Sequence, residues 1–328
     1  MKFLIVGTGS IGRRHYKNLL ALGYRDVAVV RSRRRMDQPQ RQFFAEYHPR
    51  VFFDVKAAFT EQPDAVFVCN PTSLHVSTGF RAVKAGSHVF IEKPISHTSA
   101  GVGELLREAA RRKRIVYVGY NFRHHPLLKK AKKLLDSGKL GRLHSARFAT
   151  GEYLPGWHPW EDHRKAYAGR SDLGGGVVLT QSHDLDLIHW FFGPAKAASA
   201  IVQNSGALGI NTDDNAVLVF SAERCPVVVS SLDYLSRPAF KRFVIIGSTG
   251  SMEWDYYENT LRITEANGKA RVIRAPEGFE RNRMYLAELK DFIHCVRRGV
   301  NPESDGKSGR AVLEMALAAK KMAKIKLS

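Results

Sequence analysis

The chain has 328 residues and a net charge of +20, from 51 Lys and Arg against 31 Asp and Glu. Hydrophobic residues make up 44% and charged residues 25%, which is ordinary for a soluble globular protein long enough for two domains. Three widely spaced cysteines exclude a disulfide framework, and no apolar run reaches transmembrane length. Because the chain runs straight into a strand with no signal peptide, we expect a cytoplasmic protein.

The positive charge could attract nucleic acid or an anionic membrane. Most of the basic clusters, however, fall on predicted helices and are interleaved with alanine and leucine. We interpret them as solvated helix faces and expect neither a nucleic-acid nor a membrane partner.

The chain opens with "LIVGTGSIGRRH", in which a glycine-rich turn joins a buried strand, residues 3–6, to an amphipathic helix, residues 10–22. Gly7, Gly9 and Gly12 give the pattern G-x-G-x-x-G. The first glycine permits a tight turn, the second lets a pyrophosphate approach the backbone, and the third lets helix and strand pack closely. In this setting the motif predicts a dinucleotide site at the helix N-terminus.

Strands and helices then alternate. Strands are expected at residues 27–30, 65–69, 88–91 and 115–119, with helices such as 73–85 and 98–113 between them. This alternation predicts an α/β domain, residues 1–121, with a doubly wound parallel Rossmann sheet that binds its ligand at the carboxyl ends of the strands.

From residue 122 the pattern changes to strands joined by short turns. A helix is expected near 126–137 and another over 183–192, and the closing helices lie near 282–298 and 306–323. The expected strands are residues 143–153, 197–203, 216–222, 227–234, 243–247, 260–264 and 270–273. Residues 122–328 are therefore predicted to form an α+β domain for substrate binding and oligomerisation on a large, open, mostly antiparallel sheet, with a cleft where the two domains meet. The C-terminal helix of this domain can pack back on the first domain.

The end of the second strand indicates which dinucleotide is bound. An NAD site usually has an acidic residue there, but this chain has Arg31, Ser32 and Arg33, with Asp26 before the strand and Asp37 well beyond it. A guanidinium can grip a 2′-phosphate in bidentate fashion. NADP is therefore the preferred cofactor, and NAD with its ribose held in another way is the alternative.

Two further stretches end at the carboxyl edge of the predicted sheet. "VFVCNPTSLH" runs from a buried strand into Asn70, and "SHVFIEKP" ends in Glu92 and Lys93. A partly desolvated lysine can exchange protons near neutral pH, although a bare "EKP" is more often a surface loop.

Together with "GYNFRHHP" and "GGGVVLTQSHDLDLIHWFFG", these motifs resemble, in their order, those of the Gfo/Idh/MocA family, the glucose-fructose oxidoreductase and inositol dehydrogenase group. The resemblance covers nearly the whole chain. It implies hydride transfer between NAD(P) and a sugar or cyclitol carbon, and a homodimer or homotetramer formed through the C-terminal sheet.

The resemblance also assigns residues. Lys93 and His183 match the family's catalytic lysine and proton-transfer histidine. The predicted cofactor-binding residues are Gly7, Gly9, Ser10, Ile11, Gly12, Arg31, Ser32, Arg33, Asn70, Pro71, Thr72, His75, Glu92 and Lys93. The predicted substrate-binding residues are Asn121, Arg123, Trp157, Trp160, Arg164, Tyr167, Thr180 and His183.

One motif departs from the family. Thr180 stands where the family usually has an aspartate, in a loop one residue shorter, so the acid–base network differs from that of the inositol dehydrogenases. His183 itself opens a predicted helix, whose dipole favours a neutral ring, while Asp184 and Asp186 oppose that effect. The sign of the net effect on His183 is left open.

The aromatic and basic stretch over residues 151–176 is too irregular for a helix and is predicted to line the substrate pocket. Its arginines slightly favour an anionic or nucleotide-linked sugar; a packed loop that clips the domains together is the competing interpretation. No metal site is predicted, because His183 and His189 lie on different faces of one helix.

Three alternatives stay open. A non-catalytic dinucleotide sensor would explain the missing aspartate, and hydrolases or epimerases that use transient oxidation also occur in this family. A nucleic-acid-binding protein is supported only by charge.

Overall fold

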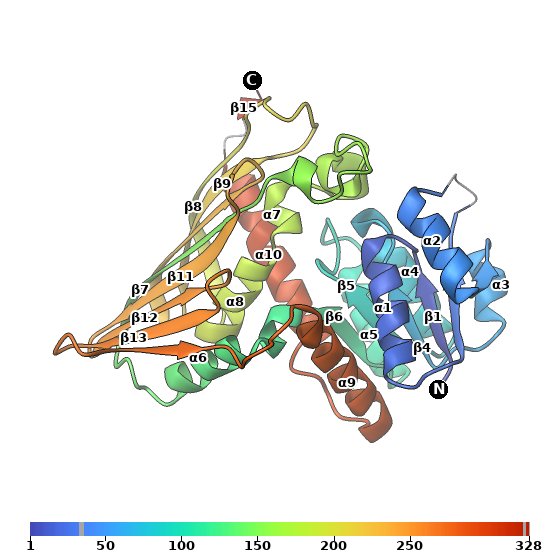
Figure 1. Ribbon diagram of the computed structural model, residues 1–328, viewed down its shortest axis with the longest axis horizontal. Coiled ribbons are helices and arrows are strands. Elements are labelled where there is room, and N and C mark those ends of the chain that lie inside the picture. The colour runs from blue at the N-terminus through green and yellow to red at the C-terminus, as the bar shows by residue number, and fades with distance from the viewer. Residues whose placement is uncertain (33–35, 324–325, 328) are drawn as a thin grey trace. The chain divides into compact units, whose positions relative to one another are not determined.

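The computed structural model describes residues 1–32, 36–323 and 326–327, and it divides into two compact units (Figure 1). Unit 1 comprises Met1–Tyr120, Asp172–Gly174 and Tyr285–Arg310. Unit 2 comprises the described residues of Asn121–Ser171, Gly175–Met284 and Ala311–Ser328. The sequence placed one division between residues 121 and 122, whereas the structure also brings a late helical segment into the first unit.

Unit 1 is built on a six-stranded parallel sheet of order β3-β2-β1-β4-β5-β6, as predicted for a doubly wound fold. Its strands are β1 Phe3–Val6, β2 Val27–Val30, β3 Arg50–Phe52, β4 Ala65–Val68, β5 His88–Glu92 and β6 Val116–Gly119. Its helices are α1 Ser10–Ala21, α2 Gln38–Tyr47, α3 Val55–Phe59, α4 His75–Lys84, α5 Val102–Arg111 and most of α9 Asn282–Arg298. The chain order reverses between β1 and β4, so a ligand site is expected at their carboxyl ends.

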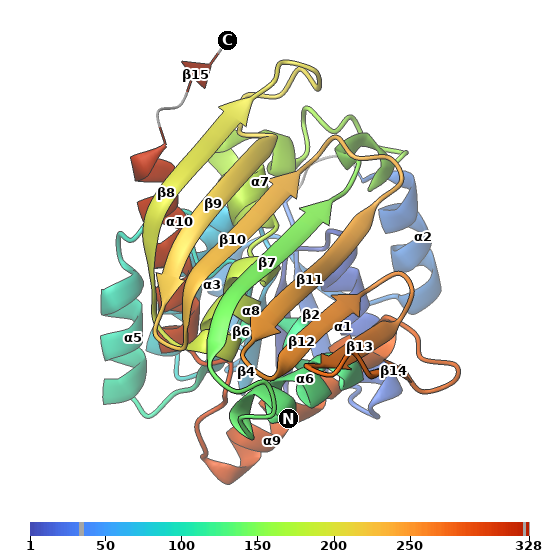
Figure 2. The ribbon, with the colours of Figure 1, turned by 90° about the vertical axis from the view of Figure 1, so that its left-hand side faces the viewer.

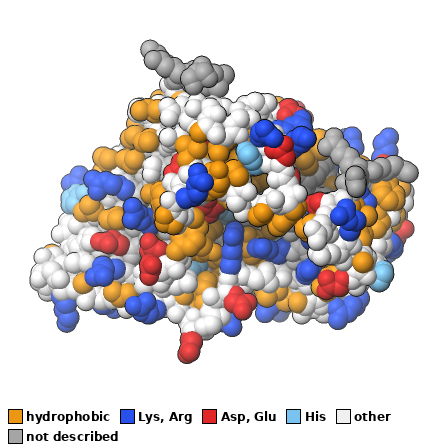
Figure 3. Space-filling view, turned by 45° about the horizontal axis from the view of Figure 1, so that its top comes forward, with side chains coloured by type: hydrophobic (Ala, Val, Ile, Leu, Met, Phe, Trp, Pro, Cys, Tyr) orange, Lys and Arg blue, Asp and Glu red, His pale blue; other side chains and the backbone are white. Residues whose placement is uncertain are grey.

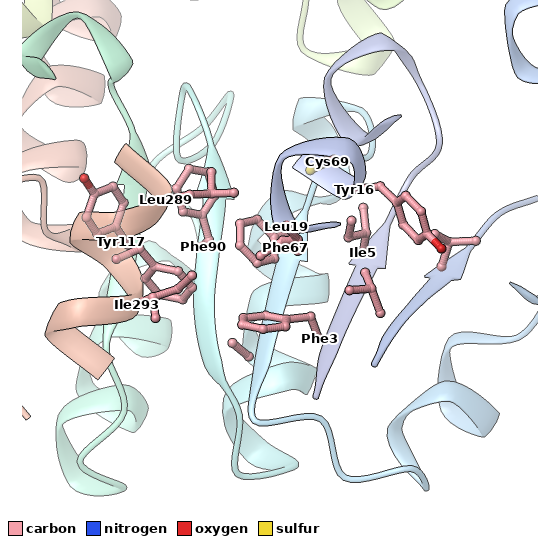
Figure 4. Packing of buried hydrophobic residues seen from close by; sticks show 14 of the residues in the cluster. Phe3, Ile5, Tyr16, Leu19, Phe67, Cys69, Phe90, Tyr117, Leu289 and Ile293 are labelled. Carbon is pink, nitrogen blue, oxygen red and sulfur yellow. The ribbon is translucent and has the colours of Figure 1, made fainter. Parts of the chain in front are cut away.

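Aromatic rings form the centre of the core in unit 1 (Figure 4). Phe90 stacks on Phe67 at 4.9 Å and on Tyr117 at 5.2 Å, which ties β4, β5 and β6 together. Phe292 from α9 meets Phe67 and Phe90 edge-on, each with its ring centroid 5.5 Å away. This contact explains why a helix distant in sequence belongs to unit 1, because burial of aromatic area dominates core stability.

Unit 2 is built on a nine-stranded sheet of order β14-β13-β12-β11-β7-β10-β9-β8-β15. Neighbouring strands are antiparallel except for the parallel pairs β7–β10 and β8–β15, so the predicted mostly antiparallel sheet is confirmed. The strands are β7 Leu143–Gly151, β8 Ala195–Asn204, β9 Asn215–Ala222, β10 Cys225–Asp233, β11 Phe240–Gly247, β12 Gly250–Asp255, β13 Thr260–Glu265, β14 Ala270–Arg274 and β15 Lys326–Leu327.

Helices cover one face of this sheet. They are α6 Pro126–Asp136, α7 Val177–Thr180, α8 His183–Phe192 and the later part of α10 Gly306–Met322 (Figure 1). Figure 2 shows the opposite face, over which no helix runs. Along β8, β9 and β10 this face carries the exposed side chains of Ile201, Val217 and Val227, which are 66%, 39% and 49% exposed.

Within the described residues, no helix is both long enough and apolar enough to cross a bilayer. On the face drawn in Figure 3, lysine and arginine side chains are scattered among hydrophobic and neutral ones and form no continuous patch. The absence of a nucleic-acid partner stays a prediction.

Candidate functional site

The glycine loop between β1 and α1 shows a separate reason for each glycine. Gly7 has φ +106°, and a Cβ there would lie 2.5 Å from the carbonyl oxygen of Cys69. A Cβ on Gly12 would collide with the carbonyl group of Gly7. At Gly9 a Cβ would meet nothing within 4 Å. Gly7 and Gly12 are therefore required for the close packing of the loop, and Gly9 leaves the backbone open to a ligand.

This loop fits a dinucleotide pyrophosphate. Helix α1 begins at Ser10, directly after Gly9, and its first turn contains no acidic residue. Gly9 offers no side chain to cap the helix, so the first N–H groups, including that of Ile11, can serve an anion. The loop also lies at the reversal point between β1 and β4.

At the end of β2, Arg31 is half-buried and its guanidinium lies 5.6 Å from the ring centre of Phe44. Ser32, next to it, is exposed, and Arg33 lies outside the described residues. Asp37 accepts a hydrogen bond from the backbone N–H of Gln40 at 2.6 Å and caps α2. The nearest following carboxylate is thus committed to its own helix.

The segment after β4 is held by His75. Its ring nitrogens lie 2.8 Å from the carbonyl oxygen of Pro94 and 2.9 Å from that of Asn70. Burial lowers the pKa of His75, while those two carbonyls and Glu92 act in the opposite direction. His75 therefore joins the end of β4 to the "EKP" segment, and contact with a ligand stays a prediction.

Beside His75, Pro71 is half-buried and Thr72 is buried at the start of a short 3-10 turn, Thr72–Leu74. The side-chain amide of Asn70 donates to Thr78 at 2.9 Å. Its Oδ1 is buried and has no hydrogen-bond partner among the described residues. A buried acceptor of this kind suits a hydroxyl or amide donor of a cofactor.

Glu92, the last residue of β5, is tied to the dinucleotide helix. Its Oε1 lies 2.6 Å from Nε2 of His15 on α1, and both side chains are buried. Its Oε2 accepts a hydrogen bond from the backbone N–H of Lys93 at 3.3 Å. Burial and Glu92 raise the pKa of the Cys69 thiol. Sequence reasoning missed His15, whose only signal was its place after the glycine motif.

In unit 2, His183 is the first residue of α8, as predicted, and it is 8% exposed. Its ring meets Phe122 edge-on with centroids 4.8 Å apart. Two carboxylates of the same turn are anchored by buried groups: Asp184 by the hydroxyl of Thr150 and the ammonium group of Lys241, and Asp186 by a second cation. Lys241 was not predicted from the sequence.

That other cation is Arg123. Its Nη2 lies 2.6 Å from Oδ1 of Asp186, and its Nε also donates to this carboxylate. The side chains are 3% and 0% exposed. Breaking a buried ion pair of this kind costs about 3–5 kcal/mol. Arg123 thus supports α8, and its contact with substrate stays a prediction.

Thr180, which replaces the expected aspartate, is 2% exposed. Burial raises the pKa of the Tyr234 phenol well above its usual value, and Thr180 acts on that pKa in the opposite direction. The neighbouring Gln181 donates to Glu152 at 3.2 Å. Asn121 is 1% exposed, and both polar atoms of its amide lack a hydrogen-bond partner among the described residues. Asn121 could therefore serve a bound polar group.

Residues 151–176 contain three short 3-10 turns, Leu154–Gly156, Tyr167–Gly169 and Ser171–Leu173, in agreement with the irregularity expected. Trp157 packs edge-on against Tyr234 with centroids 5.5 Å apart. Trp160 and Tyr167 are 47% and 36% exposed. Arg164 is exposed and bonds Asp162 two residues away. Substrate binding by these residues stays a prediction.

Within the part of the chain that the structure describes, no group of three or more His, Cys, Asp or Glu side chains could hold a metal ion.

The fold and the glycine loop define a dinucleotide-binding protein, and two family models identify its class as an oxidoreductase. Residues 1–120 match the oxidoreductase family with an NAD-binding Rossmann fold, and residues 128–253 match the GFO/IDH/MocA C-terminal domain. The chain belongs to the Gfo/Idh/MocA family. The resemblance drawn from the motifs and the class of NAD(P)-dependent oxidoreductase are thereby confirmed.

Individual relatives are more distant. A myo-inositol 2-dehydrogenase of Thermotoga maritima is 27% identical, over 98% of this chain and 96% of its own. A levoglucosan dehydrogenase, solved in complex with NADH, has a TM-score of 0.86 at 16% identity and covers 98% of both chains. A UDP-N-acetylglucosamine 3-dehydrogenase from Acidithiobacillus ferrooxidans has a TM-score of 0.80 at 22% identity, over 99% of this chain and 98% of its own. The two structures share the fold.

The open face at Gly9 yields a test. Gly9→Ala leaves folding intact, because its Cβ meets nothing within 4 Å, but places a methyl group where the pyrophosphate approaches. We expect dinucleotide affinity to fall by about tenfold or more. Fluorescence titration with NADP and NAD measures the affinity, and a thermal melt checks the fold.

The matched control is Gly156→Ala, whose Cβ would lie 4.0 Å from Tyr153 and outside the loop. Unchanged affinity in Gly9→Ala would show that the pyrophosphate does not approach this backbone.

Proposed function

We propose that this protein is an NAD(P)-dependent dehydrogenase or reductase of a sugar or sugar derivative. The observation that carries the proposal is the position of Lys93. It directly follows β5, at the same carboxyl edge of the sheet as the glycine loop. A half-buried lysine at this edge is placed to act on a group bound beside the cofactor.

The bound nicotinamide ring would accept or donate the hydride at the hydroxyl-bearing carbon. His183 takes the proton of that hydroxyl during oxidation and returns it during reduction. Its place at the start of α8 puts the ring at a helix N-terminus, whose dipole opposes protonation, while Asp184 and Asp186 of the same turn act in the opposite direction. Lys93 donates a hydrogen bond to the reacting oxygen and stabilises the negative charge that develops there.

NADP is the proposed cofactor. Arg31 directly follows β2, where an NAD site usually has a carboxylate, and the side chain of Asp37 caps α2. A guanidinium at this place supports recognition of a 2′-phosphate.

The proposed substrate is an anionic or nucleotide-linked sugar. Thr180 removes a negative charge from the loop before His183, so an anionic substrate meets less repulsion there. The segment 151–176 adds basic side chains and aromatic rings, among them Arg164 and Trp157. A related fold belongs to a dehydrogenase of a UDP-linked sugar.

We further propose a homodimer or homotetramer that forms through the uncovered face of the sheet in unit 2. Ile201, Val217 and Val227 are exposed on three neighbouring strands, and exposed apolar patches of this kind mark interfaces. A cytoplasmic location is proposed as well, since all three cysteines are free thiols.

The catalytic roles are tested by Lys93→Ala and His183→Ala. Each should lower kcat by about 10²-fold or more, because each removes a proton-transfer or charge-stabilising group. Dinucleotide affinity should stay within a few-fold of wild type. Turnover is followed by the absorbance of the reduced nicotinamide, against a panel of free, acidic and nucleotide-linked sugars.

His144→Ala is the matched control, because His144 is an exposed histidine of β7 in the same unit. Wild-type turnover in Lys93→Ala or His183→Ala would refute the assignment of that residue.

The cofactor preference is tested by Arg31→Ala. The KM for NADP should rise about tenfold or more through loss of a charge-assisted contact to the 2′-phosphate, and the KM for NAD should change little. Steady-state kinetics with both cofactors measure the two values. Lys56→Ala, an exposed lysine of α3, controls for loss of one positive charge in the same unit. Equal changes in both KM values would argue against NADP recognition by Arg31.

The oligomer is tested by Ile201→Glu. A carboxylate within an apolar contact is costly, so the assembly should dissociate toward the monomer mass. Light scattering coupled to size exclusion measures the mass. Lys269→Glu, an exposed position in the turn between β13 and β14, is the control. A monomeric wild type would end this proposal.

A further inference from the structure

Lys241 is a buried cation for which the proposed reaction has no use. It lies on β11 with a 4% exposed fraction, on the inward face that also carries Phe243 and Ile245. A lysine in such a position is costly unless an anion and hydrogen-bond acceptors meet its ammonium group. What it contacts therefore indicates why it is there.

The ammonium group of Lys241 reaches two acceptors. Its Nζ lies 2.7 Å from Oγ1 of Thr150 and 3.2 Å from Oδ1 of Asp184. Thr150 sits directly across from Lys241 in the β7–β11 pairing, and its hydroxyl donates to the same carboxylate at 2.9 Å. Lys241, Thr150 and Asp184 thus form a closed buried group that fixes the residue next to His183.

The first turn of α8 is fixed from a second side as well. Asp186 is held by the guanidinium of Arg123, which comes from the 3-10 turn Asn121–His124. Phe122 of that turn lies close to both His183 and Lys241. Its ring centroid is 4.8 Å from that of His183 and 5.3 Å from Nζ of Lys241. His183 therefore sits on a turn that β7, β11 and the 3-10 turn all hold.

Two buried ion pairs lie beside His183. Helix α8 contributes the carboxylates of Asp184 and Asp186, and each meets one buried cation, from Lys241 and Arg123. His124, on the same 3-10 turn as Arg123, adds no charge at neutral pH. Its pKa is lowered to about 3 by burial and by the cations of Lys129 and Arg123.

The two ion pairs affect how the dipole of α8 and the aspartates together act on His183. The two aspartates alone would favour a protonated His183, against the dipole of α8. Each carboxylate is paired with a cation, so the loss of either partner changes the net charge beside the His183 ring.

We propose that Lys241 is a positioning and charge-balancing residue for His183, and that it acts through Asp184. The proposal rests on the proposed role of His183 in proton transfer. Lys241 itself touches no reacting atom in this scheme.

The test is the pH dependence of kcat/KM for oxidation, measured in Lys241→Met, Asp184→Asn and the double variant. Lys241→Met leaves a carboxylate unbalanced beside His183, so the acidic limb of the profile should move to higher pH. Asp184→Asn leaves a cation unbalanced, so the limb should move to lower pH. Each shift should be on the order of one pH unit, and the double variant should return toward the wild-type profile.

The double variant also guards against failure to fold, because it buries no unbalanced charge. Thermal melts and dinucleotide affinity check each protein. The matched control is the partly exposed ion pair on α6, changed as Lys132→Met with Asp136→Asn; Asp136 also pairs with Arg224 away from His183, so the profile should stay where it was.

Profiles of all three variants that coincide with wild type, while His183→Ala has lost turnover, would overturn this inference alone. Turnover retained in His183→Ala would overturn the proposed function together with it.

Discussion

The close approach of Gly12 to the carbonyl group of Gly7 is the contact on which the nucleotide half of this protein depends. No side chain fits between them, so position 12 must be glycine for α1 to start directly above the end of β1; Gly7 is required separately, by its φ of +106° and by the carbonyl group of Cys69. Its uncapped N-terminus then faces the carboxyl edge of the sheet. The same edge carries Asn70 after β4 and Lys93 after β5, so one steric requirement collects the residues proposed to serve the cofactor.

Buried polar contacts then hold in place the segments that follow β4 and β5. Glu92 connects β5 to α1 through His15, and His75 connects the end of β4 to Pro94. Contacts of this kind add little net stability but are costly to leave unmade. Their effect is geometric, because they hold the backbone of Lys93 in one place.

In unit 2, buried ion pairs hold a functional segment in place in the same way. Two ion pairs, Asp184 with Lys241 and Asp186 with Arg123, anchor the turn that begins at His183. His183 is thus held on a helix whose first turn is anchored from two sides.

The sequence by itself determined the local elements and their class. Alternating apolar runs and glycine turns predicted most strands of both sheets, the glycine loop and the start of α8 at His183, because these depend on neighbours a few residues apart. Short β3, with exposed Arg50, has no such pattern and was missed.

Only the tertiary structure decided that His15 meets Glu92, 77 residues away, and that Lys241 meets Asp184, 57 residues away. It likewise brought Phe292 of α9 into the core of unit 1. The partner of a buried charge or ring is set by the packing of distant segments, and the local pattern of its own strand or helix does not specify that partner.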